Sequence, residues 1–293
     1  MIDIDHLYKV YKSGRGIFDI TLKVEKGEVF GFIGPNGAGK TTTIRQLMGF
    51  TNADSGSCSI GGKDTRKQAE IIQRDLGYVP GEISYFENMT GNCFMDFMTG
   101  LRGGRGDERR IELCEFFELE NDRPLKKMSK GMKQKVALIT AFMHDPDILL
   151  LDEPSSGLDP LMQKRFVELI LSEKKRGKTI FLSSHTFDEV ERTCDRAAII
   201  REGHIAAIED ISRLRSQITK SCLVTFSEKN DMLRIRNSGL AFKELDETKV
   251  EIFIEDNYSK MINTLADCSV TNMDMPQQGL EQIFLKYYGK EGV

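Results

Sequence analysis

The sequence lacks the features of several classes of protein. No apolar stretch approaches the roughly 20 residues that span a bilayer, and the apolar run from Ile148 to Leu151 suits a buried strand. The N-terminus has neither the basic start nor the long apolar stretch of a signal peptide. The six cysteines contain no C-x-x-C pair and the four histidines are dispersed, so neither set predicts a zinc site. We therefore expect a cytosolic chain that does not itself cross a membrane.

The composition is that of a soluble globular protein. Of the 293 residues, 29% are charged and 40% are hydrophobic, which is enough for one large domain and a smaller one. A formal net charge of -4 argues against a surface that wraps nucleic acid. A disulfide framework is not expected in a chain of this size, so the cysteines are predicted to be reduced and mostly buried.

The most informative stretch runs from Gly34 to Thr41 and reads GPNGAGKT. It fits G-x-x-x-x-G-K-[ST], the Walker A phosphate loop, and it lies between an apolar run of strand length (28–33) and a helical pattern (42–48). Glycines let backbone N–H groups curl around an anion, and the helix N-terminus favours negative charge. Lys40 would reach the β- and γ-phosphates and Thr41 would bind Mg²⁺. A plain glycine-rich turn is the alternative, which the complete motif in its required context disfavours.

A second motif is an apolar strand that ends in two carboxylates, Asp152 and Glu153. This is the Walker B arrangement. Asp152 would orient the Mg²⁺ shell, and Glu153 would polarise the attacking water as a general base. Two solvated acids that close a strand are the alternative, and the Walker A loop upstream makes that alternative weaker.

Two further positions are less specific when taken alone. Ser129 precedes an apolar helical run (136–142) and can cap it, which could place the helix N-terminus against an anion, although an ordinary N-cap explains the pattern as well. His185 follows a buried-looking strand (180–184). A lone histidine is usually structural, but this one lies at the strand edge shared with the phosphate loop, which favours contact with the γ-phosphate.

Strands alternate with helices through most of the chain, which implies a largely parallel sheet covered on both faces, with phosphate sites at the carboxyl ends of its strands. Between 84 and 141 the pattern becomes helical. We predict strands at 2–10, 17–24, 75–80, 148–152, 179–183, 197–201 and 204–209, a short strand with flanking turns within 55–62, and helices at 163–176, 187–194 and 210–217.

The last part of the chain changes style. Short strands are predicted at 222–226, 241–245 and 249–255, and helices at 258–265 and 280–288. The order is roughly βαββαβα, which suggests a small α+β module of ferredoxin-like type. We therefore expect two domains, 1–215 with a helical subdomain at about 84–141, and an accessory domain at 216–293.

Taken together, the motifs resemble the nucleotide-binding subunit of an ABC transporter over about residues 1–215. Their order is Walker A, a Tyr78-Val79-Pro80 loop, a signature at Ser129 to Met132, Walker B, the stretch Ser156 to Asp159, and the switch histidine. The branch that exports drugs, bacteriocins and polysaccharides is the most similar, and the stretch from Gly279 to Tyr288 is similar to its tail module. The implied fold is α/β, a P-loop NTPase ABC cassette with a mostly parallel covered sheet, an antiparallel β part and a helical subdomain, followed by the small α+β module.

The resemblance implies an ATPase with ATP and Mg²⁺ as its ligands. ATP would lie between two cassettes, in a homodimer or a heterodimer, and would drive a separate integral membrane permease that exports a drug, peptide or other amphipathic substrate. The chain would be cytoplasmic and peripheral at the inner face of the cell membrane, with no nucleic-acid partner. Tyr11 would stack on adenine, Ser129 and Gly131 would act on the partner's nucleotide, Asp159 would cross the interface, and His185 would sense the γ-phosphate. The phosphate-binding residues implied in this way are Asn36, Gly37, Ala38, Gly39, Lys40, Thr41 and Thr42.

Two positions depart from the family's motifs. Lys130 and Met132 replace the first glycine and the glutamine of the signature, and Lys130 either helps to bind an anion or points outward. Gly81 stands where a metal-binding glutamine is usual, so Glu82, the next residue, or a water would take that ligand position.

Two rival functions remain. A soluble ABC-type ATPase that acts on ribosomes or DNA usually has two fused cassettes or long coiled-coil insertions, and this sequence has neither. A regulatory nucleotide-binding module would not need the intact Glu153 and His185. The transported substrate cannot be read from the sequence.

Overall fold

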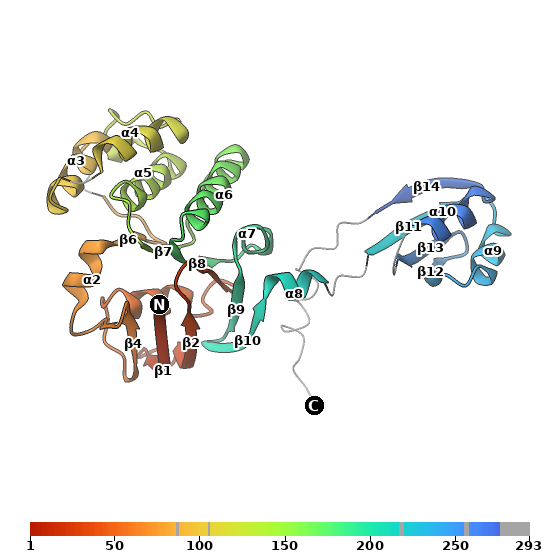
Figure 1. Ribbon diagram of the computed structural model, residues 1–293, viewed down its shortest axis with the longest axis horizontal. Coiled ribbons are helices and arrows are strands. Elements are labelled where there is room, and N and C mark those ends of the chain that lie inside the picture. Colours follow the sequence, from red (N-terminus) through yellow and green to blue (C-terminus); the bar gives the residue numbers. More distant parts are fainter. Residues whose placement is uncertain (86–87, 105, 217–219, 255–257, 276–293) are drawn as a thin grey trace. The chain divides into compact units, whose positions relative to one another are not determined.

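The computed structural model describes residues 1–85, 88–104, 106–216, 220–254 and 258–275 (Figure 1). It divides into two compact units. Met1–Ile211 belong to the first, and the described part of Ser212–Lys286 forms the second. No helix of the described residues is both long and apolar enough to span a bilayer.

The first unit contains a four-stranded antiparallel sheet of order β2-β1-β4-β5. Along β2, buried apolar residues alternate with exposed polar residues, as expected when one face of a sheet meets the core. The two strands expected at 2–10 and 17–24 are confirmed. The four strands are β1 (Ile2–Val10), β2 (Gly16–Val24), β4 (Ser55–Ile60) and β5 (Lys63–Asp64).

A six-stranded sheet of order β10-β9-β3-β8-β7-β6 forms the centre of this unit. Its strands pair in parallel except for β10, which is antiparallel to β9. Every residue of β3 and β8 is buried, because the sheet is covered on both faces, and the predicted parallel, covered sheet is confirmed. The strands are β3 (Val29–Ile33), β6 (Leu76–Val79), β7 (Ile148–Asp152), β8 (Thr179–Ser184), β9 (Arg196–Arg201) and β10 (His204–Asp210).

The register of this sheet aligns the strand ends that carry the motifs. Ile33, the last residue of β3, pairs with Ser184, and Asp152, the last residue of β7, pairs with Ser183. The chain leaves all three strands at the same edge, so the segments that follow them converge there.

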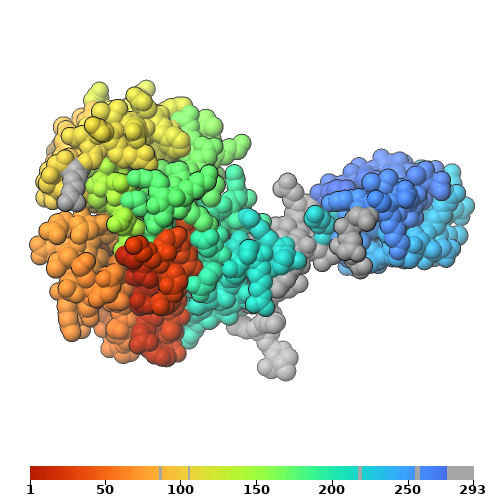
Figure 2. Space-filling model, viewed as in Figure 1, coloured from red at the N-terminus to blue at the C-terminus, as the bar shows by residue number. Residues whose placement is uncertain are grey.

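The stretch at about 84–141, predicted to be helical, contains α3, α4 and α5. These helices lie together at one end of the first unit and appear yellow and yellow-green in Figures 1 and 2. The strands β1 and β2, drawn in red, lie toward the other end of this unit. Helix α2 was not predicted, because it is short and buries only Ile72. The helices are α1 (Lys40–Leu47), α2 (Ala69–Asp75), α3 (Gly91–Leu101), α4 (Asp107–Phe116), the 3₁₀ turn η1 (Leu125–Lys127), α5 (Lys130–Phe142), α6 (Pro160–Lys175) and α7 (Phe187–Thr193).

Helix α6 begins earlier than the expected 163–176. The Asp159 carboxylate accepts hydrogen bonds from the N–H groups of Leu161 and Met162, and Pro160 occupies the first turn. An acidic N-cap followed by proline is a strong helix start, so the apolar periodicity alone placed the boundary too late.

The core of the first unit lies between its two sheets and α1. Phe181 stacks on Phe30 with ring centroids 6.0 Å apart and packs against Phe32 in a tilted arrangement at 5.3 Å, and Ile44 and Leu47 of α1 are fully buried in the same cluster. This packing fixes α1 against the central sheet, and with it the loop that precedes the helix.

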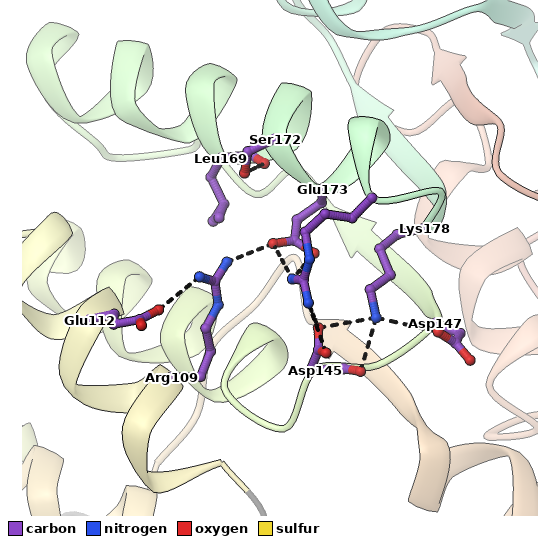
Figure 3. A network of polar contacts seen from close by, with 9 residues as sticks. Arg109, Glu112, Asp145, Asp147, Leu169, Ser172, Glu173 and Lys178 are labelled. Carbon is purple, nitrogen blue, oxygen red and sulfur yellow. Dashed lines mark hydrogen bonds and ion pairs between the residues drawn. The ribbon is translucent and has the colours of Figure 1, made fainter.

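A network of charged side chains joins the helical part to the sheet (Figure 3). Glu173 of α6 is 2% exposed, and its carboxylate accepts hydrogen bonds from Arg109 of α4 at 2.6 Å and from Arg176 at 2.9 Å. Arg176 and Lys178 also pair with Asp145, which precedes β7. The network therefore connects α4 with the end of α6 and with the segments that precede β7 and β8, at the sheet edge opposite the motifs.

The second unit is an α+β fold with a four-stranded antiparallel sheet of order β12-β13-β11-β14. The described order, βαββαβ, and this strand order confirm the ferredoxin-like prediction. The helix expected at 280–288 lies outside the described residues. The elements are β11 (Lys220–Phe226), α9 (Asp231–Asn237), β12 (Ala241–Asp246), β13 (Lys249–Ile254), α10 (Ser259–Ala266) and β14 (Val270–Asp274), and α8 (Ile211–Ser216) lies where the two units divide.

All six cysteines are free thiols, as expected. The expectation that most are buried is only half met. Cys58, Cys194 and Cys222 are buried, Cys93 is exposed, and the remaining two are partly exposed. Cys93 lies on the exposed face of α3. The sequence alone does not distinguish this position from a buried one.

Candidate active site

The segment between β3 and α1 forms a tight loop. Gly37 and Gly39 have φ angles of 81° and 113°, a region that side chains rarely adopt. A Cβ on Gly39 would also lie 2.7 Å from the Ile17 side chain, so only glycine lets the loop approach β2 this closely. Helix α1 starts directly after it at Lys40. The loop therefore combines glycine conformations with the N-terminus of a helix, an arrangement that suits an anion.

Lys40 is buried at the mouth of this loop, with 4% of its surface exposed. Its ammonium donates to the carbonyl oxygens of Gly34 at 2.7 Å and Pro35 at 3.1 Å, and it lies 3.1 Å from Glu153 Oε1. A buried ammonium needs paired oxygens. Here two are carbonyls and one is a carboxylate, so an incoming phosphate would compete with Glu153 for the same cation.

Asp152 is fully buried at the end of β7. Ser183 Oγ donates to its Oδ1 at 2.6 Å, whereas its Oδ2 has no hydrogen-bond partner. Burial raises the pKa of this carboxyl, and the Ser183 hydroxyl and then the nearby Thr41 hydroxyl oppose that rise. A buried, unpartnered carboxylate oxygen beside the Thr41 hydroxyl fits a small cation with oxygen ligands, of which Mg²⁺ is one.

The described residues contain no group of three or more His, Cys, Asp or Glu side chains that could hold a metal. Mg²⁺ commonly takes one or two protein oxygens and completes its shell with phosphate and water. Thr41 and Asp152 fit that pattern. A Cβ on Gly81 would lie 2.8 Å from Asp152 Oδ2, so the glycine leaves room for this carboxylate.

Glu153 follows Asp152 and connects the phosphate loop with the histidine. It has a positive φ of 47°, which is uncommon for a residue with a side chain and typical of functional turns. Its N–H donates to Ser183 Oγ at 3.0 Å, and His185 Nδ1 lies 3.4 Å from its Oε2. The two oxygens of one carboxylate thus contact Lys40 and His185, one each.

A cavity of about 530 Å³ brings many of the expected residues together. Among them are Tyr11, most of the phosphate loop and Glu82, which is an exposed residue, while Ala38 of the loop is buried and does not line the cavity. Sequence reasoning missed Ser13, Arg15 and Arg45, which also line it; the basic, glycine-containing turn at 12–15 was the available signal. The lining residues are Tyr11, Ser13, Arg15, Gly16, Asn36, Gly37, Gly39, Lys40, Thr41, Thr42, Arg45, Gly81, Glu82 and Glu153.

The residues expected to act on a partner's nucleotide are outside this cavity. Ser129 Oγ accepts a hydrogen bond from the Met132 N–H at 3.2 Å and caps α5, and Asp159 caps α6. Gly131 lies against the turn that contains Gly157. Within one chain, the expected site residues therefore fall into two sets, one around the cavity and one at the N-termini of α5 and α6.

Comparison with known proteins gives concordant results. The family model described as "ABC transporter" matches residues 17–156. The linearmycin resistance ATP-binding protein LnrL of Bacillus subtilis is 30% identical over 99% of this chain and 99% of its own length. The Nod factor export ATP-binding protein I of Burkholderia pseudomallei is 32% identical over 99% of this chain and 97% of its own.

Solved structures are similar as well. One described as an ATP binding subunit of an ABC transporter is 32% identical, with a TM-score of 0.68 over 74% of this chain and 92% of that one. A dimeric ATP-binding cassette bound to ADP and Pi has a TM-score of 0.65 at 23% identity over 72% of this chain and 99% of that one, which is a likeness of fold.

Proposed function

This chain belongs to the family of ABC transporter ATP-binding subunits, whose cassettes bind and hydrolyse ATP, and on that premise we propose that it powers the export of an amphipathic compound through a separate membrane permease. The observation that carries the ATPase role is the contact of one carboxylate, Glu153, with both Lys40 and His185 beside the buried Asp152.

The triphosphate enters at the phosphate loop. Its anionic oxygens displace the Glu153 carboxylate from Lys40, because the loop N–H groups and the ammonium bind phosphate together. Tyr11 lines the same cavity and would stack on the adenine base of the nucleotide. Thr41 and Asp152 would hold Mg²⁺, with Glu82 or a water in the position that Gly81 leaves open. When bound, Mg²⁺ neutralises charge that develops on the phosphate oxygens.

Glu153, once released from Lys40, is the candidate general base for the attacking water. Its carboxylate would accept a proton from that water, and His185, which contacts the same carboxylate, is the proposed contact of the γ-phosphate. A general base of this kind contributes roughly 10²–10⁴ in rate.

A second cassette would complete the site. Ser129, Gly131 and Asp159 lie away from the cavity of their own chain, which supports their use on the nucleotide of a second, identical or related cassette. Nucleotide would favour the closed pair and hydrolysis would reopen it, a population shift that a permease can use.

The proposed cargo and location rest on the relatives. The linearmycin resistance protein and the Nod factor export protein both match almost all of this chain; one name specifies resistance to a compound and the other specifies export, which supports an export role. We therefore place this chain at the cytoplasmic face of the membrane, against an integral permease contacted by α3 and α4.

Phosphate release and partner capture test this proposal together. The tagged full chain is purified from detergent-solubilised membranes and from the ribosomal fraction of the cells that make it, and each sample is assayed with Mg·ATP. We expect an integral membrane protein in the captured complex and hydrolysis that Lys40→Ala abolishes by weakening nucleotide binding. Capture of ribosomes without a membrane protein would instead support the rival soluble ATPase, and absence of hydrolysis even with the membrane partner present would refute the proposal.

A further inference from the structure

The first two turns of α5 are joined by side chains to the turn that follows β7. Gln134 Nε2 donates to the carbonyl oxygen of Pro154 at 2.8 Å in a buried hydrogen bond. Lys130 Nζ donates to Ser156 Oγ at 3.0 Å at the surface. Residues four apart share one face of a helix, so the two bonds lie in a row.

Two glycines make the contact close. Gly157 has a φ of 82°, and a Cβ on it would lie 3.0 Å from the Cγ and Cδ atoms of Lys130. A Cβ on Gly131 would lie 2.7 Å from the carbonyl oxygen of Gly157. The methylene groups of Lys130 therefore lie along the turn. The backbone of α5 approaches the same turn closely at Gly131, where no side chain intervenes.

Helix stability does not account for a lysine at this position. Lys130 is the first residue of α5, where the positive end of the helix dipole disfavours a cation, and the first turn has no acidic residue to offset it. The described residues also provide Lys130 with no carboxylate within ion-pair distance, and the acceptor it uses is Ser156. The lysine thus serves the contact rather than the helix.

Helix α5 and the turn after β7 each adjoin a helix N-cap, Ser129 and Asp159, and the proposed function assigns both caps to the partner's nucleotide. Ser129 directly precedes Lys130, and Asp159 follows the bound turn. We propose that Lys130 is a positioning residue of the ATPase, which ties the turn at 154–157 to α5 so that Ser129 and Asp159 keep one spacing when two cassettes meet. This inference rests on the proposed two-cassette function and adds to it a residue that departs from the family's usual signature.

The test compares four variants in the full chain with its membrane partner. Lys130→Met keeps the apolar stem but loses the donor, Lys130→Arg restores a donor, Ser156→Ala removes the acceptor, and Lys133→Met removes a neighbouring charge of the same helix as a control. We expect Lys130→Met to lower kcat about tenfold. The Kd for Mg·ADP on the single cassette should be unchanged, because the hydrogen bond between Lys130 and Ser156 lies outside the nucleotide cavity. Lys130→Arg should recover at least half of the activity, and Lys133→Met should match the unaltered chain.

Combining two changes separates positioning from a simple loss of charge. If Lys130 acts through Ser156, the double variant Lys130→Met with Ser156→Ala should be no slower than the slower single variant. Additive losses, a kcat for Lys130→Met equal to that of the unaltered chain, or no recovery with Lys130→Arg would each overturn the inference. Failure of the proposed function itself would look different, since the unaltered chain would then not hydrolyse Mg·ATP.

Discussion

Lys40 Nζ lies 3.1 Å from Glu153 Oε1, so the cation of the phosphate loop and the candidate general base form an ion pair. Lys40 has only 4% of its side chain exposed, which makes the pair hard for water to replace. We propose that phosphate oxygens compete with the Glu153 carboxylate for this ammonium, because one cation cannot pair equally well with both anions.

Replacement of Glu153 by Gln tests this relationship. We expect kcat for ATP hydrolysis to fall by roughly 10²–10⁴, the range for a lost general base. Affinity for Mg·ATP, measured by calorimetry, should be retained or increased, because an amide competes less well for Lys40. Glu120→Gln, at a side chain that is 80% exposed, is the control and should leave both values unchanged. Hydrolysis at the normal rate would remove Glu153 from its role.

Asp152→Asn should separate stability from metal binding. Burial raises the pKa of Asp152 above its usual value of 3.8, so the native state binds this proton more tightly than the unfolded state, and native stability falls as pH rises through that window. At neutral pH the ionised group therefore costs stability. The amide keeps an acceptor for Ser183 without the charge, so we expect a higher Tm for the nucleotide-free chain.

The same variant should lose the additional Tm increase that Mg²⁺ produces in the presence of ADP, because Asp152 supplies a metal ligand. Asp5→Asn, at a side chain that is 74% exposed, serves as the control. A lower Tm together with a retained Mg²⁺ effect would contradict both parts of this prediction.

Removal of Glu173 should lower the free energy of unfolding more than removal of its neighbour Glu112 in the charged network of Figure 3. Its buried carboxylate is shared by Arg109 and Arg176, whose side chains are 30% and 43% exposed. Glu173→Ala would leave both guanidinium groups without this acceptor, and partial solvation reduces the cost to about 2–3 kcal/mol in the free energy of unfolding. Urea denaturation measures it. Glu112→Ala removes the exposed partner of Arg109 and should cost under about 1 kcal/mol. Equal effects would show that burial of Glu173 is unimportant.

His144 should make the chain sensitive to mild acid. Burial, and then the neighbouring Arg102, lower the pKa of His144 from 6.5 to about 4, while Asp145 has a smaller opposing effect. Arg102 Nη1 lies 2.7 Å from His144 Nδ1, which fits a neutral imidazole as acceptor. The unfolded state therefore binds more protons between these values, and stability falls as pH drops from about 6.5 toward 4.

The difference in the free energy of unfolding between pH 7 and pH 5 should be about 1–2 kcal/mol smaller in His144→Gln than in the unaltered chain. His204→Gln, at an exposed histidine, is the matched control. If both variants keep the full pH dependence, another group is responsible for it.

Most of the candidate site was predictable because its motifs are local. A glycine loop between a strand and a helix, and an apolar strand that ends in two acids, have spacings set by backbone geometry within a few residues. The strand–helix alternation similarly indicated a covered parallel sheet. Helix α2 and the start of α6 were not predicted, since a short amphipathic turn and an acidic cap leave little trace in apolar periodicity.

The sequence by itself determined which residues could bind phosphate, accept a proton or cap a helix. Only the tertiary structure decided that Glu153 lies between Lys40 and His185, and that Lys130, for which two directions were open, extends along Gly157 to Ser156. The physical reason is that local conformation depends on neighbours in the chain. The meeting of distant side chains depends on which strands pair, in which register, and on how closely glycine lets two backbones approach.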